Sequence, residues 1–152
     1  MAYRDSASFG KRQEYIAVAE LLRRGFDVYM TLVDDQQIDC VIRLDEIPPR
    51  YLDIQIKARS NTAKYPGLFA ALEIRAPRRG FFFIFFSEPA DTYWVIPSLD
   101  VVRKTNIGKS GRAKGKYHLN LATRRRDGSV VPRPKWSEYE NAFALLTGMA
   151  TP

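Results

Sequence analysis

Apolar residues near the N-terminus recur every three to four positions. This spacing predicts an amphipathic helix over residues 10–24, and Gly25, directly after two arginines, is a typical helix stop. Glu14 falls inside the apolar arc of this helix, whereas Glu20 falls on the polar face, where Arg24 can pair with it. An acid on the core side is costly without a partner, so Glu14 either meets a cation or hydrogen-bond donor or is an early-turn acid favoured by the helix dipole. The apolar positions are Tyr15, Val18, Ala19, Leu21 and Leu22.

After this helix, apolar and polar positions alternate with period two, the pattern of half-buried strands. Three such segments follow one another with short polar turns between them, which predicts an antiparallel meander. A later segment is apolar at every position, so we expect an inner strand covered on both faces. The predicted strands span 26–33, 37–44, 50–58, 81–86, 92–96 and 117–121.

Three further segments complete the predicted architecture. Residues 67–74 fit either a short helix or a strand, and a short helix is expected to start at Pro97 and Ser98. Residues 136–146 carry aromatic and apolar side chains at helical spacing, which predicts a closing amphipathic helix. The chain shows no internal repeat and no domain boundary, so we interpret residues 1–152 as a single α+β domain.

The overall composition is that of a globular protein. The chain has 152 residues, of which 45% are hydrophobic and 27% charged, and no apolar run approaches the roughly 20 residues that span a bilayer. We therefore expect no membrane association. The single cysteine, Cys40, excludes an internal disulfide and is interpreted as a small core residue, with the cytoplasm as the default location. His118, without a partner motif, is interpreted as a structural or surface residue.

Positive charge is concentrated in one part of the chain. The net charge is +7, but residues 101–135 hold eleven Lys and Arg against one acid and carry +10, which leaves −3 for the remainder. A basic segment on an acidic body predicts a polyanionic partner, with a solubilising loop as the alternative. The candidate nucleic-acid contacts are Lys109, Arg112, Lys114, Lys116, Arg124, Arg125 and Arg126.

Polar residues gather on one face of two neighbouring predicted strands. Asp53, Gln55 and Lys57 share one face of the strand at 50–58, because side chains alternate with period two, and Asp39 lies on the preceding strand. An acid on one strand, followed on the next by an acid or amide two residues before a lysine, resembles the catalytic motif of the PD-(D/E)XK nuclease superfamily.

This resemblance covers residues 10–59, including the helix that carries Glu14, and the motifs fall in the order typical of the superfamily. It implies a restriction-endonuclease-like fold of the α/β (α+β) class. In that fold an N-terminal helix is followed by a three-strand meander in a mixed central sheet flanked by helices. The chain is similar to small, single-domain members of the bacterial or phage type.

The resemblance also implies a metal-dependent chemistry. Mg²⁺, or Mn²⁺ in its place, lowers the pKa of a bound water and contacts the phosphate. Hard oxygen donors suit such ions. The implied metal ligands are the Asp39 carboxylate, the Gln55 side-chain carbonyl, the backbone carbonyl of Ile56, and Glu14 directly or through water. Lys57 is implied to position the water or to stabilise developing charge, which completes the catalytic set of Glu14, Asp39, Gln55 and Lys57. Gln55 departs from the commonest pattern, an acid, and predicts weaker metal binding.

Our leading hypothesis is therefore a Mg²⁺-dependent endonuclease that cleaves DNA. The alternative is a nucleic-acid-binding module of the same fold whose metal site has degenerated, and a third interpretation is an unrelated α+β protein with a basic interaction loop. Cleavage of both strands by so small a chain would favour a homodimer.

The candidate residues also have purely structural interpretations. Asp39 can open a strand or pair with Arg43, and Lys57 with Arg59 can form an ordinary solvated strand face. Asp53 is expected to be a solvated residue at the start of its strand.

Overall fold

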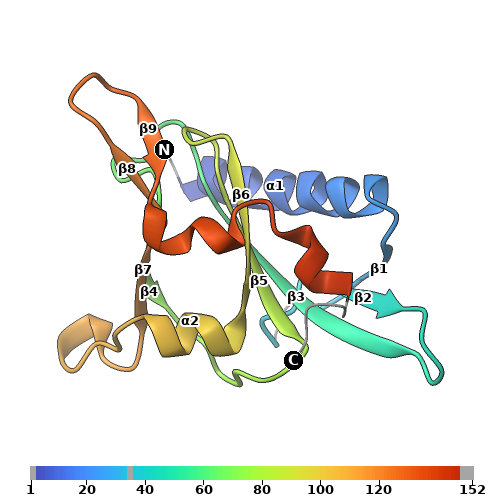
Figure 1. Cartoon of the computed structure of the whole chain (residues 1–152). Helices are drawn as coiled ribbons and strands as arrows, with labels where there is room; N and C mark the ends of the chain where they lie inside the picture. Colours follow the sequence, from blue (N-terminus) through green and yellow to red (C-terminus); the bar gives the residue numbers. More distant parts are fainter. Residues whose placement is uncertain (1–2, 34–35, 148–152) are drawn as a thin grey trace.

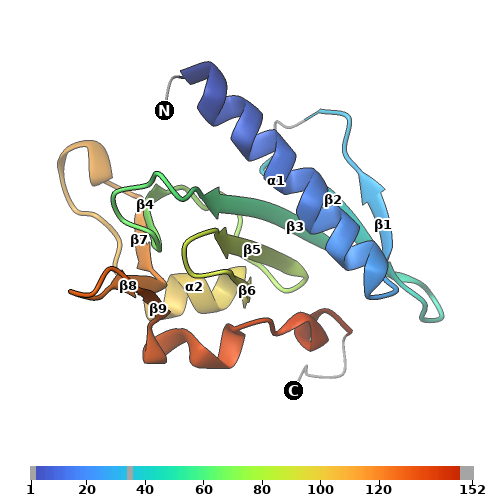
Figure 2. The same ribbon diagram turned by 90° about the horizontal axis from the view of Figure 1, so that it is seen from above.

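The computed structural model describes residues 3–33 and 36–147. One long helix, α1 (Tyr3–Arg23), lies across one face of a five-stranded sheet of order β1-β2-β3-β5-β6 (Figures 1 and 2). The helix starts well before the predicted residue 10, because Asp5 favours the first turn and Phe9 is buried against the body. The five strands are β1 (Asp27–Met30), β2 (Cys40–Leu44), β3 (Arg50–Arg59), β5 (Phe81–Ser87) and β6 (Thr92–Pro97).

The sheet is mixed, with the predicted meander at one side. β1, β2 and β3 pair antiparallel in sequence, β3 pairs parallel with β5, and β5 pairs antiparallel with β6. The strand at 81–86 is an inner one, as its all-apolar sequence predicts. The expected fold class, an N-terminal helix followed by a three-strand meander in a mixed sheet, is confirmed.

Two hydrophobic cores lie on the two faces of the sheet. The first lies under α1 and takes the even-numbered positions of β3, among them Ile54 and Ile56. The second lies on the opposite face and takes Phe81, Phe83 and Phe85 of β5. Since β5 runs parallel to β3 with Gln55 beside Phe83 in register, the polar face of β3 points toward the second core.

The buried stripe of α1 differs from the predicted one. Tyr15 and Leu22 are 59% and 55% exposed, although both were predicted to face the core. The buried positions follow a spacing of four residues along the helix, which carries the stripe away from these two side chains. They are Phe9, Gln13, Ala17, Val18 and Leu21. No helix in the described residues is long and apolar enough to cross a membrane.

A second, two-stranded sheet covers the far end of β3. It pairs β4 (Leu68–Leu72) with β7 (Tyr117–Asn120), so the ambiguous segment 67–74 is a strand. A hairpin of β8 (Ala122–Arg124) and β9 (Val130–Pro132) follows. Between β6 and β7 lie α2 (Ser98–Lys104) and a short turn of 3₁₀ helix, η1 (Gly111–Ala113).

The prediction of one closing α-helix over 136–146 is wrong. The segment forms two 3₁₀ helices, η2 (Pro134–Tyr139) and η3 (Phe143–Thr147). Between them Asn141 takes a φ of 49° and its N–H donates to the Tyr93 carbonyl of β6 at 2.7 Å. The break has a packing reason, because η2 packs into the second core and η3 into the first, so the chain must bend around the sheet edge.

Candidate active site

Asp39 ends the pairing between β2 and β3. The ladder of paired residues stops at Cys40 opposite Ile54, and the Asp39 N–H still donates to the Ile54 carbonyl at 2.8 Å. Further along β3, the Ile56 N–H donates to Oδ2 of the Asp39 side chain at 2.7 Å, so a carboxylate oxygen takes the place of a backbone carbonyl of β2. Asp39 is 6% exposed, so this carboxylate is held in a buried position beside Gln55 and Ile56.

Gln55 presents a buried oxygen to the same region. Its side chain is 7% exposed, and Oε1 has no hydrogen-bond partner among the described residues. A buried polar atom without a partner is costly, and native structures contain few of them. Oε1 therefore has a lone pair available to bind a hydrogen-bond donor or a cation, on the strand next to the one that leads from Asp39.

Lys57 and Arg59 continue the polar face of β3 into a cavity of about 370 Å³ walled by β4. Both side chains are half-buried. The Arg59 guanidinium donates from Nε to the Leu68 carbonyl at 2.5 Å and lies 5.1 Å from the centre of the Phe69 ring. Burial lowers the pKa of Arg59, which places a partly desolvated cation beside Lys57.

Glu14 approaches the same end of β2 from α1. It is paired with Lys11 at 2.9 Å, which supplies the cation that an acid on this helix face requires. That hydrogen bond and the charge of Glu14 raise the pKa of Lys11, and the charge of Asp39 adds to the rise. Burial, followed by the charges of Asp39 and Glu14, raises the pKa of the Cys40 thiol to about 12. The charges of Glu14 and Asp39 therefore both raise the pKa of Lys11 and of Cys40.

The side-chain oxygen atoms of Asp39 and Gln55 are of the kind that binds a hard divalent cation, although one of the two groups is a neutral amide. The described residues contain no group of three or more His, Cys, Asp and Glu placed to hold a metal. Asp39 offers a carboxylate and Gln55 a buried amide oxygen that nothing in the described chain satisfies, and Mg²⁺ prefers such oxygen ligands. These oxygen atoms fit Mg²⁺, and a neutral Gln55 would bind it more weakly than a second carboxylate on β3 would.

Two residues with structural alternatives have other partners. Asp53, at the start of β3, pairs with Arg78 at 2.5 Å and is not simply solvated. Arg43 forms an ion pair with Asp45, with 3.7 Å between Nη1 and Oδ1.

Gln37 was missed by the sequence analysis and connects the site to β4. It has a φ of 60°, in the left-handed region, just before Ile38 and Asp39. Its Nε2 donates to the Glu73 carbonyl at 2.9 Å, and its Oε1 accepts the Arg75 N–H at 3.0 Å. The side chain thus joins the entry to β2 with the end of β4, and it lines the Lys57 cavity.

Replacing Gln37 with alanine should lower the free energy of unfolding by about 1–2 kcal/mol, because two net hydrogen bonds are lost. Urea unfolding followed by circular dichroism measures the change. Gln36→Ala is the matched control, since Gln36 is exposed and should change stability by less than about 0.5 kcal/mol. Equal stability of the two variants would show that Gln37 does not hold β4.

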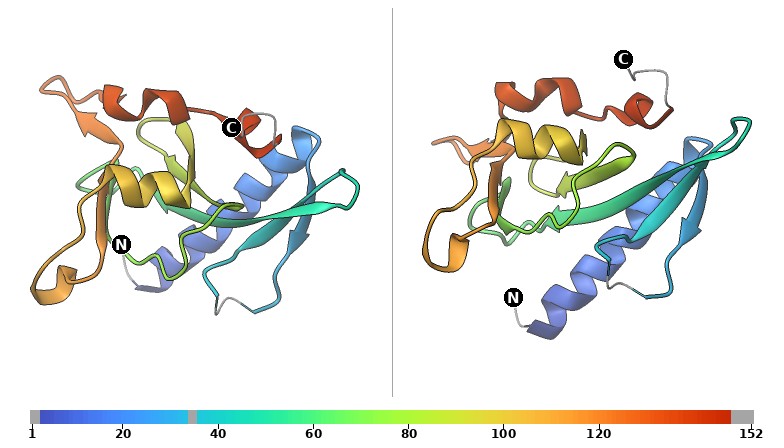
Figure 3. Two further views of the ribbon diagram at one scale, coloured as in Figure 1. Left: turned by 60° about the horizontal axis from the view of Figure 1, so that its bottom comes forward. Right: turned by 90° about the horizontal axis from the view of Figure 1, so that it is seen from below.

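The predicted nucleic-acid contacts lie on two projecting segments. The chain between α2 and β7 stands out from the body as a loop (Figure 3), closed by hydrogen bonds from the Gly115 N–H to the Gly108 carbonyl and from the Gly108 N–H to the Lys116 carbonyl. Gly108 is required there, because a Cβ would lie 2.0 Å from the Ala113 carbonyl oxygen. Lys109, Arg112 and Lys114 are exposed on this loop, and Arg124, Arg125 and Arg126 on the β8–β9 hairpin.

Comparison with known proteins finds a likeness at the level of structure. No family model matches the sequence, and no curated protein matches it. The solved structure of a bacterial homing endonuclease, I-Ssp6803I, is similar, with a TM-score of 0.59 over 91% of this chain and 90% of that chain. The two sequences are 18% identical. The chain therefore shares the fold of this endonuclease structure.

Proposed function

We propose that the protein is a Mg²⁺-dependent endonuclease of the PD-(D/E)XK type that hydrolyses phosphodiester bonds of DNA. One observation carries this proposal. A buried carboxylate, that of Asp39, and an amide oxygen without a hydrogen-bond partner, that of Gln55, occur on neighbouring segments of the sheet. The fold shared with a homing endonuclease supports it. Mn²⁺ would serve the same site, because it also takes oxygen ligands.

Asp39, Gln55, the Ile56 backbone carbonyl and Glu14 are the residues that would hold the metal. When bound, Mg²⁺ supplies an activated water and relief of negative charge at the phosphate. Asp39 is pre-positioned for this role by its hydrogen bond from the Ile56 N–H, so little side-chain entropy is lost on binding.

Lys57 and Arg59 would act on the scissile phosphate from the cavity walled by β4. The Arg59 guanidinium is half-buried and has no carboxylate partner among the described residues, so a phosphate would supply its counter-charge. Lys57, two residues nearer the metal ligands, would orient the attacking water or stabilise charge on the leaving oxygen.

The exposed cations of the α2–β7 loop and the β8–β9 hairpin would hold the DNA backbone. Contacts of Lys and Arg to phosphates position a duplex without reading its sequence. They also make affinity fall steeply with salt, because each contact releases a counterion.

A binding module without catalysis is the second candidate. The observation that favours it is the neutral Gln55 together with the lack, in the described part of the chain, of a third metal-ligating acid at the site. Such a protein would retain salt-sensitive DNA affinity without any dependence on divalent ions.

Purified protein should nick supercoiled plasmid with Mg²⁺ and stop when EDTA removes the metal. Lys57→Met should lower the rate by about 10²-fold, because a charge facing the phosphate is lost. Lys64→Met, which removes an exposed lysine from the loop before β4, is the matched control and should cleave like wild type. If no protein cleaves but all retard DNA in a salt-sensitive manner, the binding module replaces the endonuclease.

A further inference from the structure

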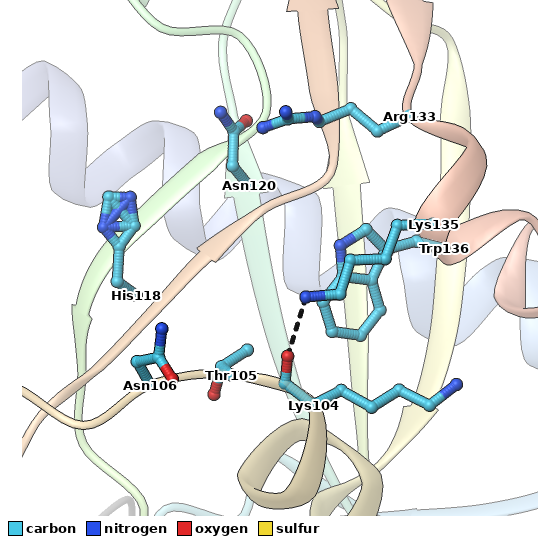
Figure 4. A pocket seen from close by; sticks show the side chains of 8 residues that line it. All are labelled: Lys104, Thr105, Asn106, His118, Asn120, Arg133, Lys135 and Trp136. Carbon is cyan, nitrogen blue, oxygen red and sulfur yellow. Dashed lines mark hydrogen bonds between the residues drawn. The ribbon is translucent and has the colours of Figure 1, made fainter.

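A second cavity shares no lining residue with the Lys57 cavity. It holds about 460 Å³, a volume within the range of small-ligand sites. Its walls come from the end of α2, from β7, and from the chain leading into η2 (Figure 4). β4 lines the first cavity and its partner strand β7 lines the second.

The second cavity is lined by cations and by no acid. The cations are Lys104, Arg133 and Lys135. Lys104 is neutralised in part by an ion pair with Glu138, and Lys135 donates to the Lys104 carbonyl at 2.8 Å. Arg133 is exposed and has no ion pair or side-chain hydrogen bond among the described residues. Its donors are therefore available to an anion, and the guanidinium fork suits a phosphate.

Asn120 adds a requirement that a bare phosphate does not meet. Its Oδ1 is buried and has no hydrogen-bond partner in the described chain. Figure 4 shows the Arg133 guanidinium and the Asn120 amide pointing toward one another. A phosphodiester has no donor for Oδ1, whereas the base of a nucleotide carries N–H groups of the kind that asparagine amides bind.

We propose that this cavity binds one unpaired nucleotide of a nucleic-acid strand, with its phosphate at Arg133 and Lys135 and its base against Asn120. His118, exposed beside Asn120 on the same strand, supplies a flat ring against which a base can stack. The inference rests on the proposed function for the source of the nucleotide, a strand held near the candidate active site. It requires no part of the metal chemistry.

Binding of mononucleotides to the full chain, followed by calorimetry without metal, tests the proposal. The probes are deoxycytidine monophosphate and deoxyribose 5-phosphate, which differ by the base. The nucleotide should bind about 10-fold more tightly, because the base donates to Asn120. Asn120→Ala should remove this difference, and Arg133→Gln should weaken both probes by about 10-fold.

Three controls separate this result from folding and from the candidate active site. Arg23→Gln makes the same change in charge at the far end of α1 and should bind like wild type (Figure 1). Asp39→Asn should also bind the nucleotide like wild type. If the wild-type protein binds the nucleotide and yet fails to cleave plasmid, only the proposed function is overturned. Thermal melting of each variant checks that it is folded.

Three results would overturn the nucleotide site. The first is equal affinity for the two probes, which would leave an anion site without base recognition. The second is an Arg133→Gln variant that binds like Arg23→Gln. The third is an Asn120→Ala variant that is folded and still prefers the nucleotide.

Discussion

Asp39→Asn should lower the rate of Mg²⁺-dependent plasmid cleavage by about 10³-fold while leaving the protein folded. Asparagine has the same shape, and its Oδ1 can still accept the Ile56 N–H, so the end of the β2–β3 pairing is kept. The variant loses the negative charge that would hold the cation. With Gln55 already neutral, Glu14 is the remaining acid of the proposed ligand set and is itself paired with Lys11.

Asp53→Asn is the matched control for this change. Asp53 lies on the same face of β3 as Gln55 but is not among the proposed ligands, and it pairs with Arg78. It should cleave within a few-fold of wild type. Initial rates of plasmid nicking over a range of Mg²⁺ concentrations make the comparison, and excess metal should rescue Asp39→Asn poorly. Full activity of Asp39→Asn would reduce Asp39 to a structural acceptor for the Ile56 N–H.

Leu21→Ala should destabilise the protein by about 2–5 kcal/mol. Leu21 is 0% exposed and belongs to the first core, where α1 packs on the Ile42 and Ile54 side of the sheet. Truncation leaves a cavity between helix and sheet that the rigid strands close only in part. Because small domains are stable by about 5–15 kcal/mol, a large share of the total would be lost.

The neighbouring residue provides the control on the same helix turn. Leu22 is 55% exposed, so Leu22→Ala should change stability by less than about 0.5 kcal/mol. Urea denaturation of both variants at one temperature measures the difference. Equal loss in the two variants would mean that Leu22 is covered in solution, and hence that α1 is buried on both sides.

The strands were predictable from sequence because their periodicity is local. The meander, the all-apolar inner strand and the strand after it lie within a few residues of the predicted bounds. The structure of the C-terminal segment was not predictable in this way. The spacing of its apolar residues fits a single helix, whereas these residues pack into two cores on opposite faces of the sheet. Spacing shows which side chains are buried, and only the fold shows that Trp136 and Phe143 are buried in different cores.

The candidate site was predictable where it depends on neighbouring strands and not where it depends on distant ones. Alternation alone placed Gln55 and Lys57 on one face of their strand, and Asp39 was placed on the strand before it. Gln37 could not be placed in this way, because its partners lie 36 and 38 residues away and are backbone groups of any sequence. The second cavity, which Asn120 lines, could not be predicted from the sequence for the same reason, since its walls come from three separate segments.

The position of β4 has a consequence for how the protein folds. The meander can form early, because its three strands are neighbours in the chain and their loops are short. The parallel pairing of β3 with β5 must close a longer crossover, and β4, inside that crossover, finds its partner β7 only after residue 116 has been made. We therefore expect slow folding, limited by these distant pairings, with both cavities completed after the strands that carry the proposed metal ligands. A nascent chain would thus carry the proposed ligand residues before it has a pocket to use them.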